Sequence, residues 1–376
     1  INNNILFIRG IRTVETNKIL IDKNFLRKTL TEKEDVLTSL CQLIDNSIQA
    51  YDKLTYKRDN ICNVKIKINK NYIIVQDNSG GIEKKVTDEE IFKIGNTSLD
   101  EFRGVGLKKA ILKLGNTVII NSNRADFSCK IQMSIKNWKA YDWSYTVEEE
   151  EYNNRLISGT RIEIKALEDV VKKEICTDDF ETNLIKKLGK IYKQRLKNNK
   201  LNLILNNINV NPVVVKGSIL TYKKANFYNE DLNFSLYIKL YKAFQNEANG
   251  MDLYINDDIV FNRNNTKLVK WNYLKEPGHS YKNCVVEVII NSEEPRNKVM
   301  TNMPYILQCV IKFIKQNNNY FVTDKISIQF EKDAKKIEAL KEYFGDATAK
   351  EVGSRAFDYL YVKYLDYISN EYKNVN

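Results

Sequence analysis

The sequence of 376 residues contains a single histidine, at position 279, and six cysteines that stand singly without a C-x-x-C pair. Structural and catalytic zinc sites need several grouped Cys or His ligands, so this scarcity argues against a zinc protein. Isolated thiols are typical of a chain that stays reduced, and we therefore expect a cytoplasmic protein.

Long hydrophobic runs are missing as well. The longest apolar-rich stretch, residues 305–314, contains Gln308 and Lys312 and is far shorter than the ~20 residues of a membrane-spanning helix. We therefore predict no membrane partner. The chain has only 14 glycines and 4 prolines, and 43% of its residues are hydrophobic, which is too apolar for a disordered protein. At roughly 150 residues per domain, we expect two or three folded domains.

Acids are outnumbered by bases, 48 to 59, which gives a formal net charge of +11. This balance indicates an anionic partner such as nucleic acid, a nucleotide or an acidic membrane surface. The bias is densest between Lys186 and Lys200, where seven Lys or Arg residues occur without an acid. We predict that this basic helix, 186–200, contacts a nucleic-acid backbone; the alternative is a solvated helix face.

Hydrophobic spacing in the first half predicts helices that pack on one face of a sheet. A capping box formed by Thr31 and Glu34 predicts a helix that begins there and ends near Tyr51. Further helices are expected near residues 87–92 and at 106–114. The expected strands are residues 62–68, 72–75, 117–121, 127–133, 144–148 and 160–165. This order predicts an α/β fold, a two-layer α/β sandwich.

Strand patterning stops at about residues 166–177, and we place a domain boundary there. The first domain is then 1–168, with an N-terminal segment 1–30, and the second is 169–376. The second domain should begin with a helix over residues 178–197. It continues with strands near 201–205, 234–240, 253–261 and 284–290, and with helices near 304–315, 331–344 and 350–372. This mixture predicts a second α/β domain.

Two segments carry side chains that suit a magnesium nucleotide. Residues 42–50 read QLIDNSIQA, which places Asn46 one helical turn after Gln42. A carboxamide oxygen at Asn46 can ligate Mg²⁺. Residues 76–82 read QDNSGGI, in which Asp77 can accept a hydrogen bond from an exocyclic amine. Gly81 allows the backbone to approach a flat base.

Two further segments complete the pattern. Residues 104–110 read GVGLKKA and open a helix whose free N–H groups, together with Lys108, can hold phosphates. Residues 158–164 read SGTRIEI and begin a strand with the hydroxyl of Thr160. Each segment alone is a weak signal, because a glycine pair after a strand is usually a turn.

In this order and spacing, the four segments resemble the motif boxes of the GHKL superfamily of ATPases, which includes gyrase B subunits, the dimeric heat-shock chaperone, histidine kinases and MutL. The resemblance covers residues 20–168 and implies the Bergerat fold with ATP and Mg²⁺ as ligands. It also implies roles for individual residues. The Mg²⁺ ligand is Asn46, the adenine contacts are Asp77, Gly81, Ile82 and Thr160, and the lid and phosphate contacts are Gly104, Val105, Gly106, Leu107 and Lys108.

The chain departs from the family pattern at three places. Ser79 stands where a glycine is expected, and Glu101 or Arg103 stands where a further lid glycine is common. Gln42 occupies the position of the glutamate that orients and deprotonates the attacking water. A glutamine holds water but cannot take its proton, so we expect ATP binding with very slow hydrolysis. A native chain that uses ATP as a switch and a substitution that traps the bound state both fit this departure.

The second domain separates the branches of the superfamily. The only histidine, His279, follows the ATP-binding region instead of preceding it, which disfavours a histidine kinase. Residues 285–298 read VVEVIINSEEPRNK and resemble the strand and P-x-x-N-K loop of MORC-like proteins, whose transducer domain sends a lysine to the γ-phosphate. Lys298 is therefore our candidate phosphate sensor; the alternative is a solvated lysine.

These inferences favour a MORC-like or MutL-like ATPase in which lid closure and dimerisation through segment 1–30 form a conformational clamp. We expect a homodimer that acts on DNA in repair, restriction or antiphage defence, with a possible operon-encoded protein partner. A chaperone-like remodeller of protein clients and a nucleotide-sensing subunit that does not hydrolyse ATP are the alternatives.

Overall fold

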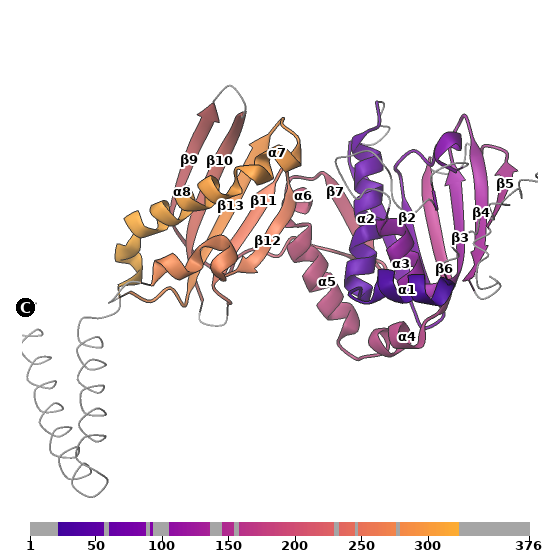
Figure 1. Ribbon diagram of the computed structural model, residues 1–376, viewed down its shortest axis with the longest axis horizontal. Coiled ribbons are helices and arrows are strands. Elements are labelled where there is room, and N and C mark those ends of the chain that lie inside the picture. Colours follow the sequence, from indigo (N-terminus) through magenta and orange to yellow (C-terminus); the bar gives the residue numbers. More distant parts are fainter. Residues whose placement is uncertain are drawn as a thin grey trace, which may run out of the picture. The chain divides into compact units, whose positions relative to one another are not determined.

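The computed structural model describes residues 22–55, 60–87, 91–92, 105–135, 145–153, 158–228, 233–244, 247–275 and 279–322. The chain divides into two compact units (Figure 1). Unit 1 is Ile1–Gly189 with Leu196–Asn211, and unit 2 is Lys190–Arg195 with Pro212–Asn376. The predicted α/β class, with a second α/β domain after the first, is confirmed.

Unit 1 contains an eight-stranded sheet of order β5-β4-β3-β6-β2-β1-β7-β8. Its neighbouring strands are antiparallel except for the parallel pair β1 and β7, in which Cys62 lies opposite Leu201. The strands are β1 Cys62–Ile68, β2 Tyr72–Asp77, β3 Gly115–Asn123, β4 Ser128–Ser134, β5 Thr146–Glu150, β6 Gly159–Leu167, β7 Leu201–Leu205 and β8 Ile208–Asn209.

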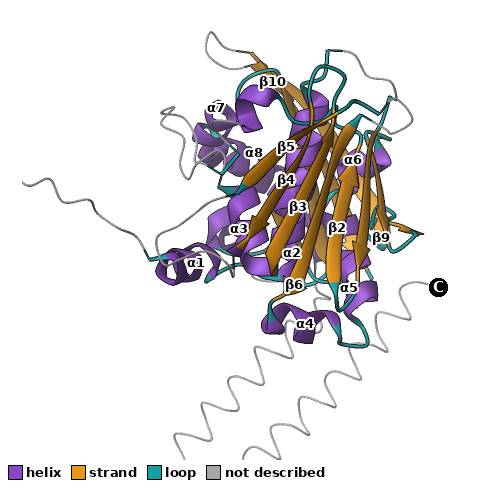
Figure 2. Ribbon diagram, turned by 90° about the vertical axis from the view of Figure 1, so that its right-hand side faces the viewer, coloured by secondary structure: helices purple, strands orange, loops and turns teal. Residues whose placement is uncertain are grey.

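Helices cover one face of this sheet, and Figure 2 shows α1, α2 and α3 behind strands β2 to β6. The helices of this part of the chain are α1 Lys23–Thr31, α2 Val36–Asp52, α3 Gly106–Leu114, α4 Asp169–Ile175, α5 Phe180–Ile191 and α6 Lys193–Lys197. The core between the layers includes Leu40 and Ile44 of α2, Ile111 of α3 and Ile73 of β2, all with 0% exposure. This arrangement is the two-layer sandwich that the sequence predicts.

The predicted capping box at Thr31 is wrong. Thr31 is the last residue of α1, and its hydroxyl donates to the carbonyl of Arg27 at 2.9 Å. The N-cap of α2 is Asp35, whose carboxylate accepts the backbone N–H of Thr38 at 2.6 Å. Two helices therefore meet at residues 32–35, because an aspartate in extended conformation caps the second one.

The boundary predicted after residue 168 differs from the observed division. Helices α4 to α6 connect β6 to β7, and β7 joins the first sheet beside β1. A parallel strand requires such a crossover, and nothing local in the helical residues shows that the chain returns to the same sheet. Most of the segment up to Asn211 thus belongs to unit 1.

Unit 2 contains a five-stranded sheet of order β12-β11-β13-β10-β9, with α8 lying along one face (Figure 1). Val286 and Val288 of the sheet pack with Ile306 and Val310 of α8 in its core. The strands are β9 Gly217–Tyr228, β10 Asn233–Ala243, β11 Gly250–Ile255, β12 Asp258–Asn264 and β13 Cys284–Ser292. The helices are α7 Arg296–Thr301 and α8 Met303–Gln316, and the 3₁₀ turns are η3 Lys267–Val269, η4 Trp271–Leu274 and η5 Asn318–Phe321.

Two expectations for unit 2 need correction or fall outside the description. The single strand predicted over residues 253–261 is a hairpin, because Asn256 and Asp257 form a turn with φ of 49° and 73°. The helices predicted at residues 331–344 and 350–372 lie outside the described residues. Among the described helices, none is long and apolar enough to cross a membrane.

The predicted basic helix is interrupted and partly neutralised. It breaks at Tyr192, between α5 and α6. Lys193 is 4% exposed and forms an ion pair with Glu287 of β13. Arg195 is 8% exposed, and its Nε lies 2.8 Å from Oδ1 of Asp258. These two cations are therefore part of the interior, and the outward basic face is smaller than the sequence predicts.

Candidate functional site

The carboxylate of Asp77 lies at the end of β2, where the residue is only 9% exposed. Its Oδ1 accepts the backbone N–H and the hydroxyl of Ser79, at 2.9 and 2.6 Å, and the backbone N–H of Thr160 at 2.9 Å. Its Oδ2 accepts the hydroxyl of Ser47, on α2, at 2.7 Å. Oδ1 thus receives three of these four hydrogen bonds and Oδ2 only one, so Oδ2 is the oxygen that can accept a further donor.

Ser79 explains its own departure from the family pattern. It does not occur among the residues with positive φ, so its backbone does not require glycine. Its side chain is 4% exposed and fills the space beside Asp77 with a hydroxyl donor. The substitution therefore adds a hydrogen bond to the acid instead of disturbing the loop.

Gly81, on the same loop, cannot be replaced by a residue with a side chain without strain. Gly81 has a φ of +80°, and a Cβ there would lie 3.0 Å from both the Oγ of Ser122 and the Cβ of Arg124. The next residue, Ile82, donates its backbone N–H to the same Ser122 hydroxyl at 2.7 Å. The loop is thus held tightly against the end of β3, with bare backbone at Gly81.

Gly159 and Thr160 bring β6 against this acid. A Cβ at Gly159 would lie 2.1 Å from the carbonyl oxygen of Asp77, so only glycine allows the two chains to approach so closely. Thr160 reaches the carboxylate through its backbone N–H. The sequence identifies Thr160 by its hydroxyl, whereas the backbone N–H makes the contact with Asp77.

Helix α2 presents the side chains of Gln42 and Asn46 one turn apart. Asn46 is exposed and available to a ligand, whereas Gln42 is half-buried. The Nε2 of Gln42 donates to Oε2 of Glu34 at 3.1 Å, and the Nζ of Lys109 lies 3.3 Å from Oε1 of the same glutamate. The Oε1 of Gln42 is buried and, among the described atoms, has no hydrogen-bond partner.

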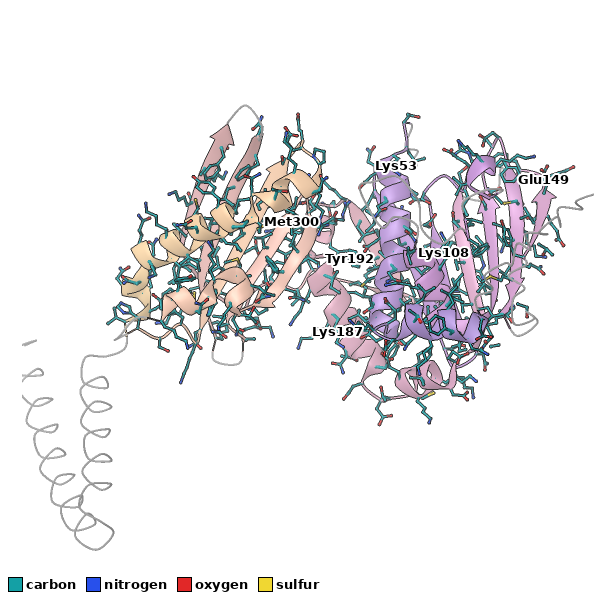
Figure 3. All side chains as sticks on the ribbon, viewed as in Figure 1. Lys53, Lys108, Glu149, Lys187, Tyr192 and Met300 are labelled. Atoms are coloured by element: carbon teal, nitrogen blue, oxygen red, sulfur yellow. The ribbon has the colours of Figure 1, made fainter. Side chains whose placement is uncertain are left out.

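Helix α3 begins beside α2 without a side-chain cap. Its N-cap residue, Val105, provides no side-chain capping hydrogen bond. A Cβ at Gly106 would lie 3.6 Å from the Cβ of Gln42, which shows that the start of α3 faces that side chain. Lys108, labelled in Figure 3, is on this first turn and is 6% exposed. Gly104 lies outside the described residues.

Charges near the start of α2 shift two carboxyl groups in opposite directions. Partial burial alone would raise the pKa of Asp35, but hydrogen bonds from Thr38 and the charge of Lys187 outweigh it and lower the pKa. Burial and the nearby Asp35 raise the pKa of Glu174. An ionised Asp35 therefore stabilises the end of the helix that carries Gln42.

Lys298, the predicted phosphate sensor, belongs to unit 2. It lies on α7, where its Nζ is 3.0 Å from Oε2 of Glu294 and its side chain is 41% exposed. Its role at the nucleotide stays a prediction.

Unit 1 thus brings together Gln42 and the start of α3 and, separately, Asp77 and Thr160 at one carboxylate, with Gly81 on the loop that follows Asp77. Three contributors were not assigned from the sequence. Ser47 and Gly159 stand next to identified residues, so closer attention to the motif neighbours could have found them. Glu34 gives no such signal, because its spacing from Thr31 imitates a helix cap.

Comparison with known families agrees with this geometry. Residues 35–167 match the family described as Histidine kinase-, DNA gyrase B-, and HSP90-like ATPase. The match contains α2, the Asp77 loop, α3 and β6. No curated protein matches the chain.

Proposed function

Residues 35–167 form a GHKL ATPase domain, and we propose that this domain binds ATP with its adenine on Asp77. The observation that carries the proposal is the unfilled acceptor position on Oδ2 of a buried carboxylate. The other donors are neutral hydroxyl and amide groups, so the negative charge of the acid is not matched by a contacting cation. An exocyclic amine fits that position, and Gly81 with Ile82 supplies close backbone beside the ring.

The phosphates are proposed to lie at the start of α3. Gly106, Leu107 and Lys108 lie at the positive end of the helix, which favours an anion, and Val105 supplies no side-chain cap there. Mg²⁺ would be held by the exposed carboxamide of Asn46 together with phosphate oxygens and water, since this ion prefers oxygen ligands. Val105 and Gly104 would belong to the lid that closes over the nucleotide.

Hydrolysis is proposed to be slow, because Gln42 cannot itself take the proton of the attacking water. Loss of a general base at this position typically lowers the rate by about 10²–10⁴-fold when no other carboxylate replaces it. Positioning of water and charge stabilisation by Mg²⁺ and lysine would remain, so turnover is reduced without being abolished.

The finer function is proposed to be that of a MORC-like clamp. Lid ordering would bring Lys298 to the γ-phosphate and couple nucleotide state to dimerisation through segment 1–30. The resemblance of residues 285–298 supports this branch. A chaperone-like remodeller, a nucleotide-sensing subunit and an operon-encoded partner stay as alternatives, since no described contact favours one of them.

DNA is the proposed client because of the net charge of +11 and the lysines of segment 186–200 that stay outside the interior. Lys186, Lys187 and Lys197 are all exposed. Changing the three to Glu should weaken DNA binding and reduce its dependence on salt, because fewer phosphates are neutralised. Mobility shifts over a range of salt concentrations measure both. The matched control changes Lys65, Lys67 and Lys70, which are equally exposed in the same unit; an equal effect of both variants would contradict the proposed surface.

The nucleotide site is tested by calorimetric titration with a non-hydrolysable ATP analogue. Asp77→Ala should abolish measurable binding, because the adenine amine loses its acceptor. Asp169→Ala is the control, since that side chain is 88% exposed and lies beyond the matched region. Unchanged affinity in Asp77→Ala would contradict the assignment.

A further inference from the structure

Glu34 is a buried acid next to the proposed reaction centre that no motif identifies. The residue is 8% exposed and directly precedes Asp35, the N-cap of α2. Both of its carboxylate oxygens have partners on other elements: Gln42 on α2 at 3.1 Å and Lys109 on α3 at 3.3 Å. A carboxylate buried to this extent normally needs such compensation, and here it comes from the two helices that form the site.

The contact with Glu34 fixes the orientation of the Gln42 amide. Only the NH₂ group can donate to a carboxylate, so Nε2 is the end of the amide that contacts Glu34, and Oε1, on the same amide carbon, is left for another donor. That Oε1 is buried and has no partner among the described atoms. A buried acceptor of this kind is costly unless a donor reaches it, and water is the smallest donor available.

We propose that Glu34 is the proton acceptor for ATP hydrolysis in this chain, while Gln42 orients the attacking water through Oε1. This inference rests on the proposed ATP site. The water oxygen forms a bond to the γ-phosphorus as the bond from that phosphorus to the β,γ-bridging oxygen breaks, and the electron pair leaves with ADP. The proton released by the water passes to the Glu34 carboxylate and from there to solvent.

The charged surroundings of Glu34 suit this role. Lys109 is its contacting cation and compensates the negative charge of the buried carboxylate. The neighbouring acid, Asp35, directs its own carboxylate to the backbone of Thr38. Because Lys109 follows directly on the first turn of α3, the acid is tied to the helix that begins at the proposed phosphate site.

The same geometry explains why glutamine fits position 42. A glutamate there would place a second carboxylate oxygen about where Nε2 now lies, 3.1 Å from Oε2 of Glu34. Two carboxylates at such a distance do not both ionise readily. Restoring Glu at position 42 alone therefore introduces repulsion, and the informative change is the reciprocal exchange of the two residues.

The experiment compares Glu34→Gln with the exchange variant Glu34→Gln/Gln42→Glu. Phosphate release is measured at saturating ATP over a range of pH, and analogue affinity and thermal unfolding are measured for each variant. Glu34→Gln should reduce the rate by about 10²-fold or more and remove the fall in rate at acid pH. The exchange variant should recover the rate of phosphate release and again show a lower rate at acid pH, because one carboxylate and one amide again face each other.

Glu32→Gln is the matched control, because this neighbouring acid is exposed. If Glu34→Gln is too unstable to assay, Glu34→Asp keeps the charge with a shorter reach, and a reduced rate with normal analogue affinity supports the proposal. A rate within about twofold of the unchanged chain for Glu34→Gln would overturn it. No turnover at all in an unchanged chain that binds ATP would overturn it too, whereas failure of the unchanged chain to bind ATP would contradict the nucleotide site itself.

Discussion

Buried acids in the two units are compensated in different ways. In unit 1, Asp77 accepts hydrogen bonds from hydroxyl and backbone amide groups. In unit 2, Glu287 is paired with Lys193 and lies 3.8 Å from the Nζ of Lys239. Asp252 is paired with Arg263 in the same way, at 3.3 Å.

This difference separates an acid that is held by neutral donors from acids that are held by cations. Among the described residues no cation contacts Asp77, so its charge remains for the proposed ligand. The cations beside Glu287 and Asp252 already compensate the charges of these two carboxylates within the fold. Burial raises the pKa of Asp252, although the Arg263 guanidinium opposes the shift. Burial alone is thus a poor guide to function, whereas the kind of partner is informative.

The largest loss of stability is expected from removing one member of the buried ion pair between Lys193 and Glu287. Lys193→Met should lower the free energy of unfolding of unit 2 by about 3–5 kcal/mol, because Glu287 is 1% exposed and would keep only the more distant cation, Lys239 at 3.8 Å. The double variant Lys193→Met/Glu287→Leu should recover most of this loss, since an apolar pair needs no compensation. Denaturant titration measures both. A loss below about 1 kcal/mol for Lys193→Met would mean that the pair behaves like one on the surface.

A smaller loss of stability is expected from a substitution at the point where the backbone of β6 approaches Asp77. Gly159→Ala places a methyl group against the Asp77 carbonyl, so unit 1 should lose about 1–3 kcal/mol through overpacking and displacement of β6. Analogue affinity should fall with it, because Thr160 no longer reaches Asp77. Gly106→Ala is the comparison for stability only, since its methyl group would have ordinary contact with Gln42. Equal stability of both variants would contradict the close approach of β2 and β6.

The smallest effect concerns Asp35. Its folded-state pKa is lowered from the ordinary 3.8, so the ionised form adds stability above that pH, and this contribution disappears as the pH falls below it. Asp35→Asn retains a capping side chain, but the free energy of unfolding of this variant should depend less on pH in the acid range. Asp35→Ala should cost about 1 kcal/mol at neutral pH through loss of the cap. Acid titration of unfolding followed by circular dichroism provides the measurement, and identical pH curves for the native and Asn chains would refute the assignment.

Features that depend on local sequence patterns are predicted better than features that depend on the pairing of distant segments. Strand β1 and helix α3 have the bounds that the sequence predicts, because alternation and a glycine start are visible within a few residues. The sequence likewise singles out Asp77 and Thr160, which the structure brings into contact, although their role at a nucleotide stays a prediction. Neither the pairing of β7 with β1 nor the buried position of Glu34 has a local signature. Both depend on which distant segment supplies the neighbour.

The parallel pairing of β7 with β1 has a consequence for the order in which the chain becomes available during translation. When residue 167 has left the ribosome, β1 to β6 are all present, yet β1 still lacks its outer neighbour. The backbone of β1 is then an open sheet edge, which invites pairing with the wrong chain. The edge is covered only once Leu201–Leu205 has emerged. Unit 1 is therefore most vulnerable to misassembly while α4 and α5 are being synthesised, after the family-matched residues 35–167 are already complete.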